Sequence, residues 1–220
     1  MSLNRQGRLT TKERYIQVAF DRDISYVGDI LAKLPKSPRV LVEVGTPLIK
    51  LYGKTAIKEI RARCGNYLVA DIKAMDRGLR EVEIAASAGA DAVTVMGLAS
   101  VETLNAFIKT CRSRNVESLI DMMNVARPYD VLSSLREQPD VIVLHRGFDE
   151  HENKSKELPL IQISDIRDRY GTPISVAGGV DLSDAQRAVF NGANIVVLSD
   201  TLTPPGELPT IAEEFIRTTH

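Results

Sequence analysis

One short stretch of the sequence places acidic and basic side chains at a spacing that suits catalysis. Residues 69–76 read VADIKAMD, so Asp71, Lys73 and Asp76 follow the apolar run YLVA at 67–70. Residues two apart in an extended chain point to the same side, which would bring the Asp71 carboxylate and the Lys73 ammonium together. A solvent-exposed salt-bridge loop has the same composition, so the rest of the sequence has to decide between the two interpretations.

The elements that must position these residues repeat regularly along the chain. Eight short β-rich runs occur at 15–20, 39–44, 67–70, 91–96, 116–120, 140–144, 173–177 and 194–198, with helical patterns between them. Several runs are continuously apolar, as expected for parallel strands that are covered on both faces. The pattern predicts a single α/β domain, a (β/α)8 TIM barrel, over residues 15–220. We prefer it to a doubly wound open sheet because eight regular units exceed what open sheets usually need.

The overall composition fits one soluble domain. Of the 220 residues, 44% are hydrophobic and 26% are charged, and the net charge of −1 attracts neither nucleic acid nor an anionic membrane. No apolar run approaches the ~20 residues needed to cross a bilayer. Cys64 and Cys111 lack metal-ligand spacing and suit the reduced thiols of a cytosolic protein. Residues 1–14 are polar and without periodicity, and we expect a flexible leader outside the fold.

In a barrel of this kind, chemistry belongs at the carboxyl ends of the strands. The polar or glycine positions there are Asp21, Glu43, Asp71, Gly97, Asp121, His145, Gly178 and Ser199. Any one of them is typical of a loop, but four carboxylates on one rim repel one another and need a cation. A divalent metal held by two carboxylates, with Lys73 neutralising the rest, meets that need, and an all-oxygen ligand set favours Mg²⁺.

The glycine pair Gly178-Gly179 predicts a phosphate site. It follows the seventh run and precedes a helix that starts near Asp181. Paired glycines let backbone N–H groups approach a phosphate at a helix N-terminus, and barrels often bind phosphate after strands 7 and 8.

Residues 71–76 resemble the Asp-x-Lys-x-x-Asp motif that follows the third strand in the orotidine-decarboxylase-like barrel superfamily. The likeness runs from Tyr15 to about Leu198. Orotidine 5′-phosphate decarboxylases have a lysine near the end of strand 2 and use no metal. This chain has Glu43 there, in VEVGTPLIK, and is similar to the metal-dependent branch of hexulose-6-phosphate synthases and 3-keto-L-gulonate-6-phosphate decarboxylases.

Three further positions separate the two activities of that branch. Asp121, Phe148 and Ala177 stand where the synthase pattern has them, whereas the decarboxylases have Glu, Arg and Thr. Arg146, in HRGFD, is the one feature that is closer to the decarboxylases.

The resemblance implies Mg²⁺-dependent aldol addition of formaldehyde to ribulose 5-phosphate, or the reverse cleavage, through an enediolate. It implies Glu43 and Asp71 as metal ligands, Lys73 as a second positive charge at the enediolate, and His145 as the proton shuttle. It further implies that Asp21 and Asp121 orient sugar hydroxyls. Asp76 would reach across a homodimer interface into the neighbour's site, so that the two subunits share their active sites.

Two alternatives stay open. In the first alternative, the chain is a decarboxylase of the same superfamily that acts on 3-keto-L-gulonate 6-phosphate or orotidine 5′-phosphate. In the second, it is a non-catalytic member that binds a metabolite or partner. The end of the eighth run favours the second, because Ser199-Asp200 stands where the family usually has Val-Gly-Gly or Val-Gly-Arg. Ser199 still offers a hydroxyl to a phosphate, but Asp200 would repel it if its side chain pointed inward.

Overall fold

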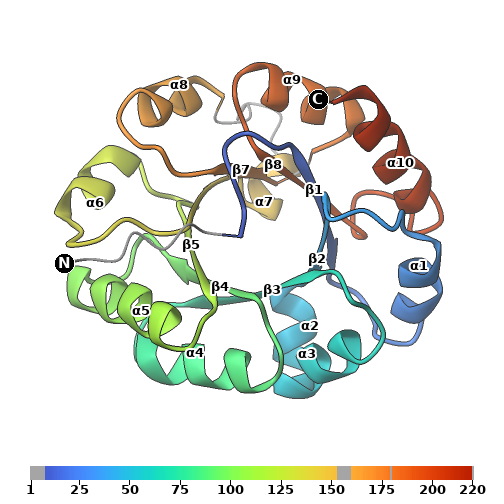
Figure 1. Cartoon of the computed structure of the whole chain (residues 1–220), viewed down its shortest axis with the longest axis horizontal. Coiled ribbons are helices and arrows are strands. Elements are labelled where there is room, and N and C mark those ends of the chain that lie inside the picture. Colours follow the sequence, from blue (N-terminus) through green and yellow to red (C-terminus); the bar gives the residue numbers. More distant parts are fainter. Residues whose placement is uncertain (1–7, 153–159, 179, 220) are drawn as a thin grey trace.

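The protein is a closed barrel of eight parallel strands, paired in chain order from β1 to β8, with β8 returning to β1 (Figure 1). This computed structural model describes residues 8–152, 160–178 and 180–219. The strands are β1 (Tyr15–Phe20), β2 (Val40–Val44), β3 (Tyr67–Ala74), β4 (Ala92–Met96), β5 (Glu117–Asp121), β6 (Val141–His145), β7 (Ile174–Ala177) and β8 (Ile195–Ser199). The predicted (β/α)8 barrel is therefore confirmed.

Helices surround the barrel, as Figure 1 shows. They are α1 (Val27–Lys33), α2 (Thr46–Tyr52), α3 (Lys54–Arg61), α4 (Gly78–Ser87), α5 (Val101–Ser113), α6 (Pro128–Ser134), α7 (Phe148–Glu152), α8 (Ile161–Arg167), α9 (Leu182–Phe190) and α10 (Leu208–Thr218). None of the helices in the described ranges has the length and apolar character that a membrane span requires.

The continuously apolar strands are buried on both faces. One set of strand side chains, for example Ile16 and Val18 of β1, faces outward and belongs to the same cluster as Phe215 of α10, the helix that contacts β1. The other set fills the barrel interior, from Tyr15 and Leu41 through Leu119 to Val143 and Val197. Each large side chain that leaves water in this way contributes roughly 1.5–3 kcal/mol, so the two layers together fix the strands that carry the site.

Strand β3 is longer than the sequence predicted. The predicted run ended at Ala70, but β3 continues to Ala74 because pairing with β4 resumes after an irregularity between Ala70 and Ala74. Inside that bulge Lys73 has a φ of 48°, in the left-handed region that non-glycine residues rarely adopt. Its backbone N–H donates to Thr94 Oγ1 at 2.9 Å, which holds the bulge in place. A bulge re-aims side chains, and here it directs Lys73 back toward Asp71.

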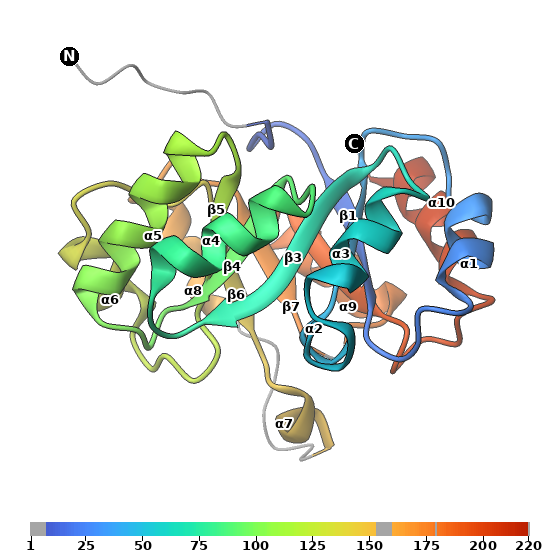
Figure 2. The same cartoon turned by 90° about the horizontal axis from the view of Figure 1, so that it is seen from below.

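The two ends of the barrel carry different segments. Helix α7 projects from the face toward which the strands run, and residues 8–14 lie on the opposite face (Figure 2). Residues 8–14 differ from the expected flexible leader. Leu9 is buried in the interior layer of the barrel, and Arg8 Nη1 lies 2.6 Å from Asp91 Oδ1. Packing against this end of the barrel removes the apolar Leu9 side chain from water, and this burial stabilises the position of residues 8–14.

Candidate active site

A cavity of about 740 Å³ opens at the carboxyl ends of the strands. It is lined by nearly all of the residues that the sequence singled out: Asp21, Glu43, Asp71, Lys73, Asp121, His145, Gly178 and Ser199. Asp76 does not line the cavity; it is exposed beyond β3, where its Oδ1 accepts from the N–H of Arg77 at 2.7 Å. The predicted phosphate residue Gly179 lies outside the described residues.

Lys73 lies between two carboxylates. Its Nζ is 3.0 Å from Asp71 Oδ2 and 2.6 Å from Asp121 Oδ2. Burial alone would lower the pKa of Lys73, but the charges of Asp71 and Asp121 outweigh it and raise the pKa above its ordinary value. Lys73 therefore stays an ammonium at neutral pH. Because Asp71 is buried, the interpretation of residues 71–76 as a mere surface salt-bridge loop does not hold for this pair.

Asp121 organises the centre of the site. Its Oδ2 also lies 2.8 Å from His145 Nδ1, and its Oδ1 accepts from the N–H of Met123 at 2.9 Å. Burial raises the pKa of Asp121, but His145 and Lys73 lower it more, so that the net pKa falls below the usual range. The sequence predicted that Asp121 orients a sugar hydroxyl. Asp121 is only 1% exposed and both of its oxygens contact protein groups, but it lines the cavity, so its contact with a sugar hydroxyl stays a prediction.

Two threonines that the sequence analysis did not identify hold Asp71. The Thr94 hydroxyl donates to Asp71 Oδ1 at 2.7 Å, and the Thr46 hydroxyl lies 2.8 Å from Asp71 Oδ2. Thr46 opens α2 directly after β2, and Thr94 lies in the middle of β4. Thr46 follows a glycine at a strand end, which is a signal that the sequence offered. Thr94 sits inside an apolar run and gave none.

Glu43 and Asp21 are the acidic groups that Lys73 does not contact. Burial, followed by the charges of Asp71 and Asp21, raises the pKa of Glu43 well above its ordinary value. Burial also raises the pKa of Asp21, and the charges of Asp200 and Asp71 add to this effect. A buried carboxylate under such repulsion is stabilised by a proton or by a cation.

The donor set fits Mg²⁺ in part. No group of three or more histidine, cysteine or acidic side chains that could hold a metal occurs within the described part of the chain. However, Mg²⁺ usually takes only one or two protein carboxylates and completes its shell with water and substrate oxygens. Glu43 and Asp71, both buried at the cavity wall and both oxygen donors, match that requirement.

Asp21 and Ser199 contact each other across the β1–β8 seam. Ser199 Oγ donates to Asp21 Oδ2 at 2.6 Å and accepts from the N–H of Thr201 at 3.1 Å. The hydroxyl that the sequence assigned to a phosphate is therefore directed at Asp21. Gly45 makes room for this arrangement, because a Cβ at that position would lie 1.8 Å from Asp21 Oδ1.

The turn after β7 requires its first glycine. Gly178 has a φ of 96°, and a Cβ there would lie 1.7 Å from the carbonyl oxygen of Arg146. Arg146 in turn donates from Nε to the carbonyl oxygen of Gly178 at 3.1 Å. Helix α9 begins at Leu182, where the predicted helix starts, and the side chain of Asp181 caps it.

Asp200 does not face the cavity. Its side chain is completely buried, and its oxygens accept from the backbone N–H of Asp21 at 3.0 Å and from the Tyr26 hydroxyl. The expected repulsion of a phosphate by Asp200 thus has no structural basis, because the carboxylate is turned away and joins β8 to the loop after β1.

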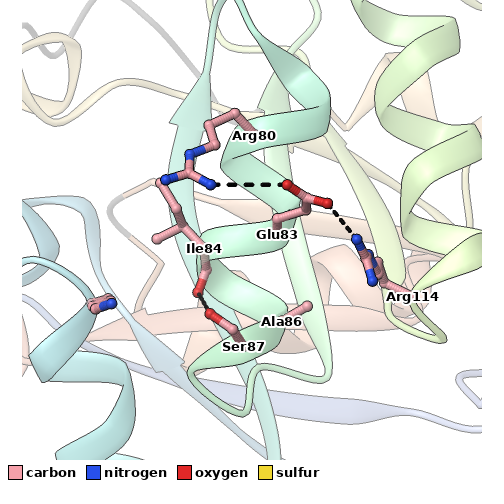
Figure 3. A pocket seen from close by; sticks show the side chains of 7 residues that line it. Arg80, Glu83, Ile84, Ala86, Ser87 and Arg114 are labelled. Carbon is pink, nitrogen blue, oxygen red and sulfur yellow. Dashed lines mark hydrogen bonds and ion pairs between the residues drawn. The ribbon is translucent and has the colours of Figure 1, made fainter.

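A second hollow, of about 480 Å³, lies on the outer surface of α4 (Figure 3). Glu83 pairs there with Arg114 and, at 4.0 Å, with Arg80. None of the predicted site residues lines this hollow, whose charged lining residues are the basic Lys54, Arg80 and Arg114 and the acidic Glu83. The cavity at the strand ends is therefore the candidate active site.

Known proteins resemble this chain over most of its length. A bifunctional enzyme Fae/Hps of Methanothrix thermoacetophila is 36% identical over 204 residues, which cover 92% of this chain and 52% of that protein. The chain thus spans about half the length of such relatives. The structure of a 3-hexulose-6-phosphate synthase from Salmonella typhimurium superposes with a TM-score of 0.81 and 26% identity, covering 92% of this chain and 99% of the other.

A 3-keto-L-gulonate-6-phosphate decarboxylase from Vibrio cholerae shares the fold, with a TM-score of 0.74, 23% identity, and coverage of 93% of this chain and 98% of the other. The sequence model of a family of enzymes matches residues 14–206, which include every described residue of the site. This chain belongs to the orotidine 5′-phosphate decarboxylase / HUMPS family.

Proposed function

We propose that this chain catalyses the aldol addition of formaldehyde to ribulose 5-phosphate, or its reversal. The observation that carries the proposal is the position of Lys73 between Asp71 and Asp121, with His145 on the same Asp121 oxygen and Glu43 in the same cavity. This arrangement provides a fixed positive charge beside a proton acceptor. Both are required where a proton leaves the carbon next to a ketone.

The first step removes a proton from C1 of ribulose 5-phosphate. Because the Nδ1–H of His145 donates to Asp121, the Nε2 lone pair is the one that takes the proton. The electron pair of the broken C–H bond passes to the C2 carbonyl oxygen and gives an enediolate, whose charge the Lys73 ammonium stabilises. C1 then attacks the formaldehyde carbon, and the formaldehyde oxygen takes a proton from the His145 imidazolium. The product is a 3-hexulose 6-phosphate.

Mg²⁺ bound by Glu43 and Asp71 would supply Lewis-acid stabilisation of the same developing charge. The protein contributes the fixed orientation of these carboxylates. Thr46 and Thr94 hold Asp71 in place, and Asp121 acts as a positioning residue that orients both Lys73 and His145. Asp21 and Gly178 both line the cavity. Asp21 would bind a sugar hydroxyl, and the turn at Gly178 would bind the phosphate.

We further propose that the active form is a homodimer to which Asp76 contributes across the interface. Asp76 is exposed and does not line its own cavity. Beside it, large apolar side chains are half exposed on the same end of β3 and α4: Met75 at 52% and Leu79 at 54%. Such a surface is stabilised when a second subunit covers it.

A decarboxylase acting on 3-keto-L-gulonate 6-phosphate is the second candidate. The feature that favours it is Arg146, whose guanidinium contacts the Gly178 carbonyl at the predicted phosphate turn. The aldol reaction is favoured over it by Asp121, Phe148 and Ala177, which line the cavity and match the synthase pattern.

The test is a direct assay of the purified chain with formaldehyde and ribulose 5-phosphate, in parallel with 3-keto-L-gulonate 6-phosphate. We expect condensation that is lost in excess EDTA and returns with Mg²⁺ or Mn²⁺. His145→Ala should lower kcat by roughly 10²–10⁴-fold, the usual contribution of general acid–base catalysis. Arg80→Ala, in the hollow on α4, is the matched control and should leave kcat unchanged.

Condensation that proceeds fully in EDTA would contradict the metal assignment. Release of carbon dioxide from the gulonate derivative without condensation would replace the proposal by the decarboxylase. If the wild-type protein binds metal but turns over neither sugar phosphate, the result would support the alternative that this chain is a non-catalytic member of the family.

A further inference from the structure

Gln17 is one of the few polar residues inside the mostly apolar barrel interior. It lies in the middle of β1, in register with Leu41 on β2 and Val197 on β8. Both of these register partners belong to the apolar interior layer, so an apolar side chain would be the default at this position. Gln17 is 3% exposed and nevertheless lines the cavity at the strand ends, where it forms part of the floor beneath Glu43.

The two ends of the Gln17 amide have different surroundings. Nε2 donates to Glu43 Oε2. Oε1 is buried and accepts no hydrogen bond from any residue in the described ranges. When Glu43 holds the proposed cation it is ionised and only accepts hydrogen bonds, so the NH₂ end faces Glu43 and the carbonyl oxygen faces away from it. Because a buried amide oxygen without a partner costs free energy, its presence beside a cavity points to something bound there that donates to it.

We propose that Gln17 is a positioning residue for the cation site, whose amide fixes the Glu43 carboxylate while its carbonyl oxygen accepts from a water or hydroxyl held in the cavity. The inference rests on the cation assigned to Glu43 and Asp71 in the proposed function. It adds a residue behind the ligand that orients it. Such partners of metal-ligating side chains set both the direction and the basicity of the ligand.

The geometry also explains why Glu43 needs such a partner. Asp71 is held by Thr46, Thr94 and Lys73, so three side chains fix its orientation. For Glu43, the hydrogen bond that the described residues provide is the one from Gln17. Removing that bond leaves the Glu43 rotamer free to turn, whereas Asp71 stays in place.

The test measures Mn²⁺ binding to chelator-stripped protein, by calorimetry or by the electron spin resonance of free Mn²⁺. Gln17→Met keeps the length of the side chain and removes both polar ends. We expect its dissociation constant for Mn²⁺ to rise roughly 10–100-fold, the usual effect of losing a partner of a metal ligand. Ser175→Ala is the matched control. Ser175 is also buried and its Oγ also has no partner among the described residues, but it does not line the cavity. The Ser175→Ala protein should bind Mn²⁺ with the affinity of the wild type.

Urea unfolding of the same variants separates positioning from a structural role. Positioning predicts that Gln17→Met differs little from the wild type in stability without metal, while Mn²⁺ binding weakens. The lost hydrogen bond to Glu43 is offset by the removal of the unpaired carbonyl oxygen. If the Gln17→Met protein does not fold, Gln17→Leu is used instead, since the interior layer already contains Leu41 and Leu119.

A dissociation constant within two-fold of the wild type would overturn the inference, as would unfolding of both Gln17 variants. A wild-type protein that does not bind Mn²⁺ would overturn it together with the cation. By contrast, wild-type protein that binds Mn²⁺ and condenses no formaldehyde contradicts only the proposed reaction and leaves the comparison of Gln17 variants intact.

Discussion

Asp200 should stabilise the fold and should not weaken phosphate binding. A carboxylate at the end of strand 8 first suggests that its removal would tighten the binding of a sugar phosphate. In the structure, the Asp200 side chain is buried away from the cavity, where it accepts from the N–H of Asp21 and from the Tyr26 hydroxyl. Replacing it with alanine removes the acceptor of the Asp21 N–H and of the Tyr26 hydroxyl, both of which are partly buried.

The size of the loss follows from these two bonds. A hydrogen bond to a charged group contributes about 1.5–3 kcal/mol, so two bonds place the lower bound of the destabilisation of Asp200→Ala at about 3 kcal/mol. For a domain of this size that corresponds to a fall in melting temperature of roughly 6–12 °C. Asp200→Asn keeps an oxygen for the Asp21 N–H and should lose only ~1 kcal/mol. Tyr26→Phe removes one donor and should fall between the two.

Urea unfolding of the three variants and of the Tyr26→Phe/Asp200→Ala double variant measures these losses, and the double variant should lose less than the sum of the single ones. The Michaelis constant for ribulose 5-phosphate is measured alongside and should not decrease in any variant. An Asp200→Ala protein that unfolds within 0.5 kcal/mol of the wild type, roughly the range of ordinary surface substitutions, and binds the sugar phosphate more tightly would refute this reasoning.

Two further outcomes test the assembly and the pH dependence. Mixing inactive Asp76→Ala protein with inactive Lys73→Ala protein should restore part of the activity, because a mixed dimer holds one complete site; an active monomer in sedimentation would rule out the shared site. Burial and the bond to Asp200 raise the pKa of Tyr26 above its ordinary value, so above about pH 10 the unfolded chain loses this proton while the folded one keeps it. The stability advantage of the wild type over Tyr26→Phe should therefore shrink as the pH rises through that range, and an advantage that grows instead would show that the tyrosine is not held protonated.

The barrel was predictable because its signal is repeated. Seven of the eight predicted strands end within one residue of the observed ones, since each is a buried apolar run with a polar residue at its end. The exception is β3, where the polar residues Asp71 and Lys73 mark a bulge within the strand and not its end. The sequence shows where polar residues begin in the run. It does not show whether the strand continues after them, which here involves the hydrogen bond from the Lys73 N–H to Thr94 on β4.

The partners behind the site were harder to predict than the site itself. Asp71, Lys73, Asp121 and His145 stand at strand ends, and their side-chain types suggest chemistry directly. Gln17 and Thr94 lie inside apolar strands, where a single polar residue has many ordinary explanations. Their role depends on the inward face of a closed barrel, which brings Gln17 to Glu43 over 26 residues of sequence and Thr94 to Asp71 over 23.

The charges in the cavity show which of the converging carboxylates are paired with a basic side chain, a distinction that the sequence alone does not make. Four acids were expected on one rim, and the repulsion among them was the argument for a cation. The structure divides them into two pairs. Lys73 contacts both Asp71 and Asp121, and His145 together with Lys73 lowers the pKa of Asp121 in spite of its burial. Among the described residues no basic side chain contacts Glu43 or Asp21, and burial raises the pKa of both more than the nearby charge of Lys73 lowers it. The cation that we propose would therefore act on the Glu43 side of the cavity, where Gln17 supplies a neutral donor to the carboxylate without neutralising its charge.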